Sequence, residues 1–428
     1  EVVKRKRKTR IEPVVDRVFY GENAMHIAGK SLVSLRDHYQ QYLFEEYLPF
    51  WQKYGIDHEL GGFICGLDHD GTCVDDSKNM WYQGRGLWTY SYLYRHFGGE
   101  ENLQVATKAR DFILAHGRDA SGDWVTGLDR TGQVVSPATQ RGYDGLFVAE
   151  GLQAYAHATG DRESLEIAIE SLWRSLSLFD DPYRFIEEGY IPENYPGMRI
   201  LGTHMVLVLT LTQMLEQVAD AKLEALCDRV VDAIVNHYWH PEYRLMNEAL
   251  DHDYQRPADT NEDFIYLGHA IETLWMLLPE AMRRKDRALF NLAAERFRRH
   301  LEVAWDDVYG GLFRAFNVHG AYTFDKVLWL QEEALVGCLI LSEHAGLDWA
   351  GEWFARVFDY VEEHFSLQQY GYPLYLYSGD RKVSYVEHVG RKEHYHHPRC
   401  VMRNLLALER MIEREGAVSG FWGGGGSG

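Results

Sequence analysis

The sequence predicts an all-α fold in which six helix pairs close into an (α/α)6 toroid, and three observations support this prediction. First, the 428 residues include only 11 Pro but 39 Gly, a composition typical of long helices joined by Gly-bearing turns. Second, a short Gly/Asp/aromatic segment recurs: Gly62 and Gly371, in its first and last copies, are 309 residues and five steps apart, or about 62 residues per step. Third, amphipathic stretches alternate with stretches that are apolar on all sides.

Each repeat begins with an amphipathic stretch, in which apolar residues follow three- and four-residue spacing with charges between them. Examples are Leu32–Tyr54, Ser164–Phe179 and Arg283–Trp305, and this pattern predicts helices with one face in water. The Gly/aromatic segment comes next and is expected to form a short hairpin or loop. Its six copies are His58–Phe63, Ala120–Trp124, Tyr183–Ile186, Tyr243–Met246, Val308–Phe313 and Gln369–Tyr372.

The second stretch of each repeat is apolar almost all round, so it is expected to be a helix buried on every side. Half-exposed and buried helices that alternate pack economically as an inner ring of six within an outer ring of six. An open solenoid is the alternative, but it usually exposes one face of every helix, so the apolar second stretches favour closure. These stretches are Leu146–Ala158, Met205–Leu215, Ala270–Leu278, Ala334–Leu341 and Val401–Leu408.

Both ends of the chain fall outside the predicted repeats. Lys4–Lys8 is a compact basic run, which we interpret as a solvated tail, and Gly423–Gly428 is typical of a flexible linker. We therefore expect a basic N-terminal extension at 1–25, one catalytic domain at 26–416 and a flexible Gly-rich tail at 417–428.

The charge balance and the cysteines restrict the class of protein. With 44 Lys and Arg against 64 Asp and Glu, the formal net charge is −20, which argues against nucleic-acid binding. The five Cys are scattered, with no CxxC pair, so neither a disulfide framework nor a structural zinc site is indicated. The longest charge-free apolar stretch, 200–215, is shorter than a membrane span, and no secretory signal is visible. We expect a cytoplasmic protein that does not contact a membrane.

If the second helices form the inner ring, their N-terminal ends meet at one mouth, and polar residues there share a cavity. One polar residue lies near each predicted helix start, at intervals of 59, 60, 65, 64 and 63 residues. Chance placement would not follow the repeat, so we expect a functional pocket. The six residues are Arg85, Asp144, His204, His269, Glu333 and His396.

Histidines suit proton transfer, because a neutral imidazole with a pKa of about 6.5 both accepts and donates a proton near pH 7. Two imidazoles on opposite walls would remove a proton from one face of a carbon and return it to the other. Glu272 follows His269 by three residues, so we expect it to share that helix face and orient the imidazole. Glu333 is expected to do the same for His396.

Six short motifs follow one another along the chain: Phe50-Trp51, Gly61-Gly62-Phe63, Leu67–Gly71, Trp81–Arg85, Gly268–Glu272 and Tyr395–Cys400. In this order and spacing they resemble the N-acylglucosamine 2-epimerase family, which includes cellobiose 2-epimerases and mannose isomerases or epimerases. The resemblance covers roughly residues 30–415. It implies an (α/α)6 barrel that acts on the open-chain form of an aldose, removing the C2 proton beside the C1 aldehyde to form an enediolate, with no cofactor or metal.

The resemblance also implies roles for individual residues. His269 and His396 match the acid/base pair, and His204 matches a third histidine associated with ring opening or stabilisation of the intermediate. Arg85 matches an arginine suited to holding the enediolate oxygens. The supporting and sugar-contacting positions are matched by Glu272, Glu333 and Trp329, and we add as expected substrate contacts Tyr143, Asp144 and Arg399.

Two departures bear on the substrate. Cellobiose epimerases carry a Trp five residues before the last catalytic His and an Asn four residues before the third His. Arg391 and Ile200 stand at those positions here, which weakens the prediction of a disaccharide substrate. The tract 393–397 is rich in His, but we expect no metal there, and His394 or His397 is instead a candidate substrate contact.

The leading hypothesis is a cofactor-independent 2-epimerase or aldose–ketose isomerase for a monosaccharide of the mannose, glucose or N-acylglucosamine type. The alternatives are a cellobiose 2-epimerase, an inverting glycoside hydrolase that uses Asp144 and Glu333, and a non-catalytic binding protein. A homodimer and a nucleotide effector are left open, although the sequence has no Gly-rich phosphate loop with Lys and Ser/Thr.

Overall fold

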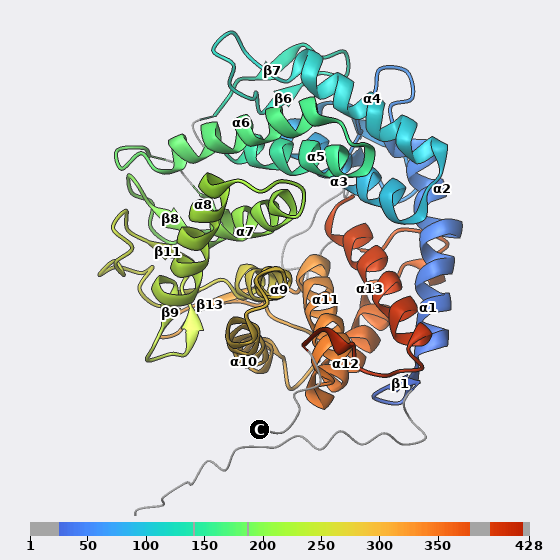
Figure 1. The fold of residues 1–428 in the computed structure, drawn as a ribbon, viewed down its shortest axis with the longest axis vertical. Coiled ribbons are helices and arrows are strands. Elements are labelled where there is room, and N and C mark those ends of the chain that lie inside the picture. Colours follow the sequence, from blue (N-terminus) through green and yellow to red (C-terminus); the bar gives the residue numbers. More distant parts are fainter. Residues whose placement is uncertain (1–24, 140–141, 186–187, 377–393, 423–428) are drawn as a thin grey trace, which may run out of the picture.

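The computed structural model describes residues 25–139, 142–185, 188–376 and 394–422, and within them helices form two concentric rings (Figure 1). The inner ring consists of α3 (Met80–Phe97), α5 (Tyr143–Thr159), α7 (Leu201–Leu215), α9 (Leu267–Arg284), α11 (Leu328–Ala345) and α13 (His396–Glu413). The outer ring consists of α1 (Leu32–Gln41) with α2 (Leu48–Phe50), α4 (Glu100–His116), α6 (Arg162–Phe179), α8 (Ala221–Asp232), α10 (Arg287–Ala304) and α12 (Asp348–His364).

The inner ring closes on itself. Each inner helix contacts the next one along the chain, from α3 to α13, and α13 in turn contacts α3. Each outer helix packs mainly against one inner helix, while α4 and α10 also touch a second one, and α1, the first along the chain, packs against α13, the last. The described residues therefore form the predicted (α/α)6 toroid rather than an open solenoid.

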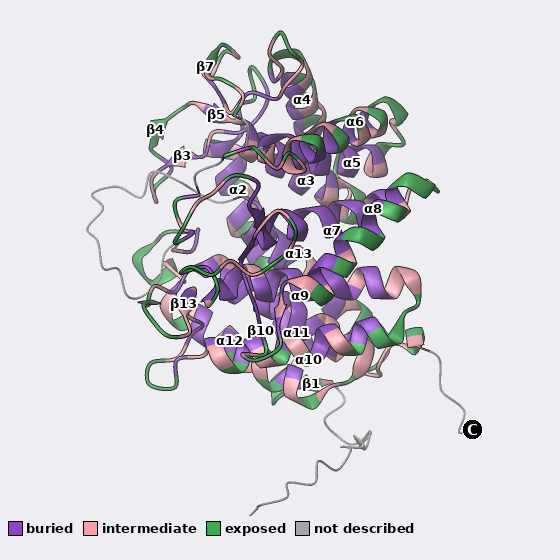
Figure 2. Cartoon of the chain, turned by 90° about the vertical axis from the view of Figure 1, so that its left-hand side faces the viewer, coloured by how far each residue is buried: buried purple, intermediate pink, exposed green. Residues whose placement is uncertain are grey.

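Burial follows the two rings, as predicted from the apolar pattern. Nearly every residue of α7 is buried, whereas α6 and α10 each keep one exposed face. Figure 2 shows buried residues concentrated on the inner helices and exposed ones on the outer helices. None of the helices in the described part of the chain is both long and apolar enough to cross a membrane.

Helix boundaries differ from the sequence prediction at two places. The stretch predicted as 283–305 is split, because its first two residues end the inner helix α9, at Arg284, and the outer helix begins at Arg287. Asp286 caps this outer helix by accepting the Leu289 N–H at 2.9 Å. The stretch 32–54 is helical throughout but contains π-helical turns at Tyr42–Tyr47 and Trp51–Gly55. Inner helices also begin before their apolar stretches, so their polar first turns belong to the helix.

Short antiparallel strands gather where the inner helices begin. They form four small sheets: β3 (Gly66–Leu67) with β4 (Cys73–Asp75); β5 (Lys78–Asn79), β6 (Gly127–Leu128) and β7 (Val134–Ser136); β8 (Arg199–Ile200) with β11 (Ala249–Leu250); and β12 (Phe264–Ile265), β13 (Ala315–Asn317) and β14 (Tyr322–Thr323). In Figure 2, β3, β4, β5, β7 and β13 lie on the same side of the molecule. Two further pairs are β1 (His26–Ile27) with β2 (Lys30–Ser31) and β9 (Trp239–His240) with β10 (Leu245–Met246).

The recurring Gly/aromatic segment forms the expected tight turn in four of its copies. Single bridges pair Ile56 with Phe63, Arg118 with Trp124, and Trp305 with Leu312, and the fourth copy forms β9 and β10. Gly62, in the first of these turns, has a φ of +81°, which an L side chain rarely adopts. The last copy ends instead in a 3₁₀ turn at Gln368–Tyr370.

Several sequence predictions concern residues outside the described part of the chain. These are the basic run Lys4–Lys8, Ile186 of the third recurring segment, Arg391 and the tail 423–428.

Candidate active site

A cavity of about 230 Å³ lies at the mouth where the inner helices begin. Six of the predicted site residues line it: Arg85, Tyr143, His269, Glu272, Trp329 and His396. Further lining residues come from the first turns of α3 and α7 and from the segments between the helices, among them Trp81, Tyr82, Thr203 and Met205 from the helices, and Glu188, Tyr190, Ile200, Tyr266 and Arg314 from the connecting segments. The closure of the ring therefore brings residues that are far apart in the sequence to one pocket, as the repeat predicts.

His269 lies in the first turn of α9, and a buried carboxylate holds its ring. Its Nδ1–H donates to Oε1 of Glu248, at 2.8 Å, so Nε2 is the basic nitrogen of the neutral imidazole. The same Glu248 oxygen accepts from the Tyr190 hydroxyl at 3.1 Å and from the Gly202 N–H at 3.3 Å. Burial opposes the charged imidazole, but the neighbouring Glu248 carboxylate outweighs it, so the pKa of His269 is raised.

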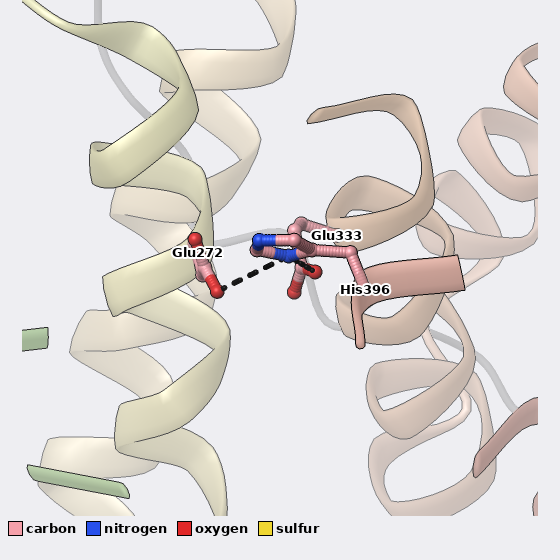
Figure 3. Close-up of side chains that lie close together, drawn as sticks. All are labelled: Glu272, Glu333 and His396. Atoms are coloured by element: carbon pink, nitrogen blue, oxygen red, sulfur yellow. Dashed lines mark hydrogen bonds and ion pairs between the residues drawn. The ribbon is translucent and has the colours of Figure 1, made fainter. Parts of the chain in front are cut away.

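His396 begins α13, and it faces two carboxylates, Glu333 from the adjacent inner helix α11 and Glu272 from α9. Its Nδ1 lies 2.8 Å from Oε1 of Glu333 and 3.7 Å from Oε1 of Glu272 (Figure 3). Arg399, one turn further along α13 and fully buried, donates to both of these carboxylates, at 2.7 Å and 2.5 Å respectively. Trp275 donates to the other Glu333 oxygen at 2.6 Å.

These contacts keep Glu333 ionised. Burial alone would raise the pKa of this carboxyl group, but the Arg399 charge and the hydrogen bond from His396 lower it to about 2. Because Glu333 is an acceptor, the Nδ1 of neutral His396 carries the proton and Nε2 is the basic nitrogen.

Aromatic rings lie next to the two histidines and around the Arg85 guanidinium. The Trp329 ring lies next to both imidazoles, with centroids 6.0 Å from His269 and 5.4 Å from His396. The Arg85 guanidinium is buried among rings, with Trp81 and Tyr395 each 4.5 Å from its carbon. The pocket thus presents two imidazoles, a cation and a flat indole surface.

Comparison with known proteins identifies the family. The family model of N-acylglucosamine 2-epimerase matches residues 61–400. The chain belongs to this family. It is 26% identical over 387 residues to N-acylglucosamine 2-epimerase of Bos taurus, covering 86% of this chain and 90% of that protein. It is 24% identical over 364 residues to cellobiose 2-epimerase of Bacteroides fragilis, covering 79% and 89%.

Solved structures support the same fold. Cellobiose 2-epimerase from Spirochaeta thermophila superposes with a TM-score of 0.74 and 19% identity, covering 89% of this chain and 98% of that one. A D-mannose isomerase superposes with a TM-score of 0.70 and 17% identity, covering 89% and 98%. The chain is therefore a carbohydrate epimerase of the N-acylglucosamine 2-epimerase family, which makes it an isomerase.

One family position departs from expectation, because His204 does not line the cavity. Its ring is buried against the outer wall, where Nδ1 lies 3.0 Å from the Tyr238 hydroxyl and Nε2 lies 3.2 Å from the Tyr254 hydroxyl. Burial lowers the pKa of His204 to about 3. Its neighbours Thr203 and Met205 line the cavity instead, since successive helix residues point about 100° apart. The predicted third epimerase histidine is thus placed outside the pocket.

Other predicted residues also lie outside the cavity. Asp144 accepts from the Thr126 hydroxyl at 2.9 Å and faces a separate small hollow beside Arg174. Glu333 and Arg399 lie behind the histidine and support it without lining the pocket. Asp144 therefore does not share the epimerase pocket, and the two carboxylates of the glycoside hydrolase alternative do not face one cavity.

The partner of His269 was wrongly predicted. We expected Glu272, one turn along the same helix, but its Oε1 accepts from Arg399 while Glu248 holds His269. Glu248 lies between β10 and β11, outside the helix starts that the prediction followed, although Glu188 precedes it by 60 residues, at the corresponding position after the third recurring segment. Glu188 and Arg314 were also missed, because both lie in connecting segments.

The His-rich tract does not reach the pocket in the part that the structure describes. His394 stacks on Trp51 with centroids 5.1 Å apart and approaches the Cys65 sulfur to 3.7 Å. His397 is hydrogen-bonded to Glu332 and, at 2.7 Å, to the Tyr42 hydroxyl. Neither lines the cavity, so the suggestion that one of them contacts substrate finds no support.

The cluster of Glu272, Glu333 and His396 also has the composition of a metal site, since their ligand atoms lie within 4.8 Å of one another. The Arg399 guanidinium already bridges the two carboxylates and supplies the positive charge that a metal would bring. The donor set therefore fits a protein cation better than a metal ion.

Proposed function

We propose that this enzyme interconverts C2 epimers of a monosaccharide, such as mannose and glucose or N-acylglucosamine and N-acylmannosamine, by proton transfer through an enediolate. The observation that carries the proposal is the matched pair of imidazoles. Both His269 and His396 donate Nδ1–H to a buried carboxylate, line the same cavity and lie next to the Trp329 ring.

The chemistry needs two groups that exchange roles. The Nε2 of one imidazole takes the C2 proton of the open-chain aldose, and the C–H electron pair moves to form the C1–C2 double bond and a negative charge on O1. The other imidazolium returns a proton to the opposite face of C2, and the carbonyl re-forms. Arg85, at the cavity wall, is the cation best placed to stabilise the enediolate oxygens.

The two histidines are suited to different halves of this cycle. Glu248 has no basic side chain within ion-pair distance other than His269 among the described residues, so its charge acts on that imidazole. Glu333 divides its charge between His396 and Arg399. We therefore assign His269, whose pKa is raised by the Glu248 charge, as the base of one proton transfer and His396 as the group on the opposite wall that completes the exchange.

A monosaccharide is favoured over cellobiose, which is the second candidate. The apolar side chain of Ile200 lines the cavity at the position where cellobiose epimerases carry an Asn. That replacement removes a hydrogen-bonding group from the wall. Cytoplasmic location, a homodimer and the domain limits 26–416 stay predictions from the sequence.

The test is to incubate the enzyme with mannose, glucose, N-acetylglucosamine, N-acetylmannosamine and cellobiose separately in D2O and follow the products by NMR. Epimerisation predicts deuterium at C2 of the product epimer, whereas isomerisation predicts a ketose labelled at C1. Turnover of cellobiose faster than of any monosaccharide would favour the second candidate. If none of these sugars exchanges a proton, the proposed chemistry is wrong.

A further inference from the structure

A second cavity, of about 220 Å³, opens at the opposite end of the ring from the active site. It is lined by the last turns of the inner helices, including Tyr92 and Arg95 of α3, His157 of α5 and Gln213 of α7, whereas the first turns of these helices surround the catalytic cavity. The two cavities share no lining residue. The second cavity is therefore a separate site, and the epimerase chemistry does not use it.

Two guanidinium groups in this cavity form no ion pair with a carboxylate of the described residues. In the described part of the chain, neither Arg95 nor Arg403 has an Asp or Glu oxygen within 4.0 Å, in a protein with 64 acidic residues against 44 basic ones. Other arginines at this end of the ring are fully paired: Arg283 and Arg284 bind Glu280, and Arg410 and Arg414 bind Glu343.

These two arginines line the cavity and make few contacts with other described residues. Arg403 lies over the Trp275 and Tyr92 rings, at 5.1 Å and 5.6 Å, and its buried Nε–H has no hydrogen-bond partner among the described residues. Arg95 is exposed and makes one such contact, from Nη1 to Nδ1 of His157 at 2.9 Å. Charged side chains in a concave site are normally paired. An arginine that lines a cavity without an ion pair is therefore a candidate for binding an anionic ligand.

The histidines of this cavity act as neutral donors. Burial and the Arg95 charge lower the pKa values of His157 and His96 to about 4, so both imidazoles are uncharged at pH 7. Since His157 Nδ1 accepts from Arg95, its Nε2 carries the hydrogen and is a donor. Glu216 is the only acidic residue among the lining residues in the described chain; burial raises its pKa, while the charges of Arg403 and Arg95 act in the opposite direction.

We propose that this second cavity binds a small molecule through an oxyanion group, a phosphate or a carboxylate, with Arg95, Arg403 and His157 as its hydrogen-bond donors. Guanidinium forks match the oxygen pairs of both groups. The Trp88 and Tyr92 rings, stacked with centroids 4.9 Å apart, form an apolar wall for the rest of the ligand.

The experiment is isothermal titration of the full chain with inorganic phosphate and, separately, with succinate, in buffer whose ionic strength is held constant with chloride. Wild type is compared with Arg95→Gln, Arg403→Gln and Arg403→Lys. Arg36→Gln, on the outer helix α1 where Arg36 pairs with Asp37, is the matched control for loss of one positive charge. Arg314→Gln reports on binding in the catalytic cavity.

We expect wild type, Arg36→Gln and Arg314→Gln to bind the same anion with equal affinity. Arg95→Gln and Arg403→Gln should bind it about tenfold or more weakly, and Arg403→Lys should show a smaller loss. The better binder of the two anions identifies the oxyanion class. Arg95 is exposed, so its variant keeps the test valid if Arg403→Gln proves unstable by circular dichroism. Absence of binding to wild type, or binding lost only in Arg314→Gln, would overturn the proposal.

Discussion

The two catalytic histidines lie at one cavity, but the walls that hold them are built differently. His269 is held by Glu248, which comes from the segment between β10 and β11 and receives its other hydrogen bonds from a tyrosine hydroxyl and a backbone N–H. His396 is held by Glu333, which comes from an inner helix and also binds Arg399 and Trp275. One carboxylate acts on its imidazole without a competing cation, and the other is shared with a buried arginine.

This difference shows how a symmetric repeat yields an asymmetric site. Epimerisation requires one group that accepts a proton while the other donates one, and different electrostatic surroundings separate two chemically identical side chains. The Glu248 charge raises the pKa of His269 and so favours its charged imidazole, whereas the Glu333 carboxylate is shared between His396 and Arg399. Each prediction below tests one part of this contrast.

The largest effect is expected from replacing either histidine. His269→Gln and His396→Gln should each lower the epimerisation rate at least about 10³-fold, because each removes one general acid or base. If the imidazoles face opposite sides of C2, each variant still exchanges the C2 proton of one epimer with D2O, and the two variants act on different epimers. NMR of exchange from each separate epimer measures this. Exchange from both epimers in both variants would contradict the two-wall arrangement.

Glu333→Gln should affect both activity and stability. The substitution removes one of two carboxylates that neutralise buried Arg399, so we expect the free energy of unfolding to fall by about 3 kcal/mol. Activity should fall about 10²-fold, since His396 loses the acceptor that fixes its tautomer. Urea unfolding and steady-state rates measure the two effects. Unchanged stability would indicate that Glu272 alone balances Arg399.

Glu248→Gln is the matched variant for the other wall, and its effect should be mainly on activity. Without the carboxylate the pKa of His269 falls, so the acid limb of the pH profile of kcat/KM should move to lower pH while the maximal rate drops about tenfold. The free energy of unfolding should fall less than for Glu333→Gln, because Glu248 does not pair with a buried arginine, whereas Glu333 pairs with Arg399. An acid limb that does not move would mean that another group controls it.

The scaffold of this site follows from the sequence better than its electrostatics does. The first and fifth repeats build the same junction between hairpin and inner helix. Lys78 reaches Asp57 at 3.0 Å and the Gly61 carbonyl, and Lys326 reaches Asp306 at 2.8 Å and the Gly310 carbonyl. These lysines were not predicted. Each lies at nearly the same distance along the chain from its recurring Gly/aromatic segment, so the repeat could have been used to predict them.

The same junctions explain why the helix-start residues converge. Gln83 and Gln331 each exchange two hydrogen bonds with the backbone of the preceding turn, at 2.8–3.0 Å, and so fix the first turn of α3 and α11. Arg85 and Glu333 follow these glutamines by two residues. Their place near the mouth was predictable from the repeat interval, whereas the partners that each one binds depend on residues from other repeats.

Predictions failed where the direction of a side chain decides its role. A repeat interval places a residue at the mouth but not on the inner face, because one residue along a helix turns the side chain by about 100°. His204 and Asp144 are therefore in the predicted turns yet outside the cavity. Glu248 was missed because it lies in the segment between β10 and β11, away from the helix starts, even though Glu188 stands 60 residues before it.

His204 gives the prediction with the smallest effect on the rate. If it is a structural residue, His204→Gln should lower the epimerisation rate less than tenfold, far less than His269→Gln or His396→Gln. A loss of about 10²-fold or more would return it to the catalytic group. The steady-state rates of the three variants decide between the two outcomes.

The pH dependence of stability separates His204 from His269 as well. Burial lowers the pKa of His204 to about 3, so the unfolded chain binds a proton there that the folded protein does not, and stability falls as pH drops below about 6.5. His204 can change the free energy of unfolding by at most about 1.4 kcal/mol per pH unit. The pKa of His269 is raised in the folded protein, so its effect on stability has the opposite sign. Its contribution to the free energy of unfolding is present below about pH 6.5 and is lost as the pH rises through the pKa of the folded state. Urea unfolding should be measured between pH 4.5 and 8. As the pH falls, the free energy of unfolding should decrease less in His204→Gln than in wild type, and as the pH rises it should decrease less in His269→Gln than in wild type.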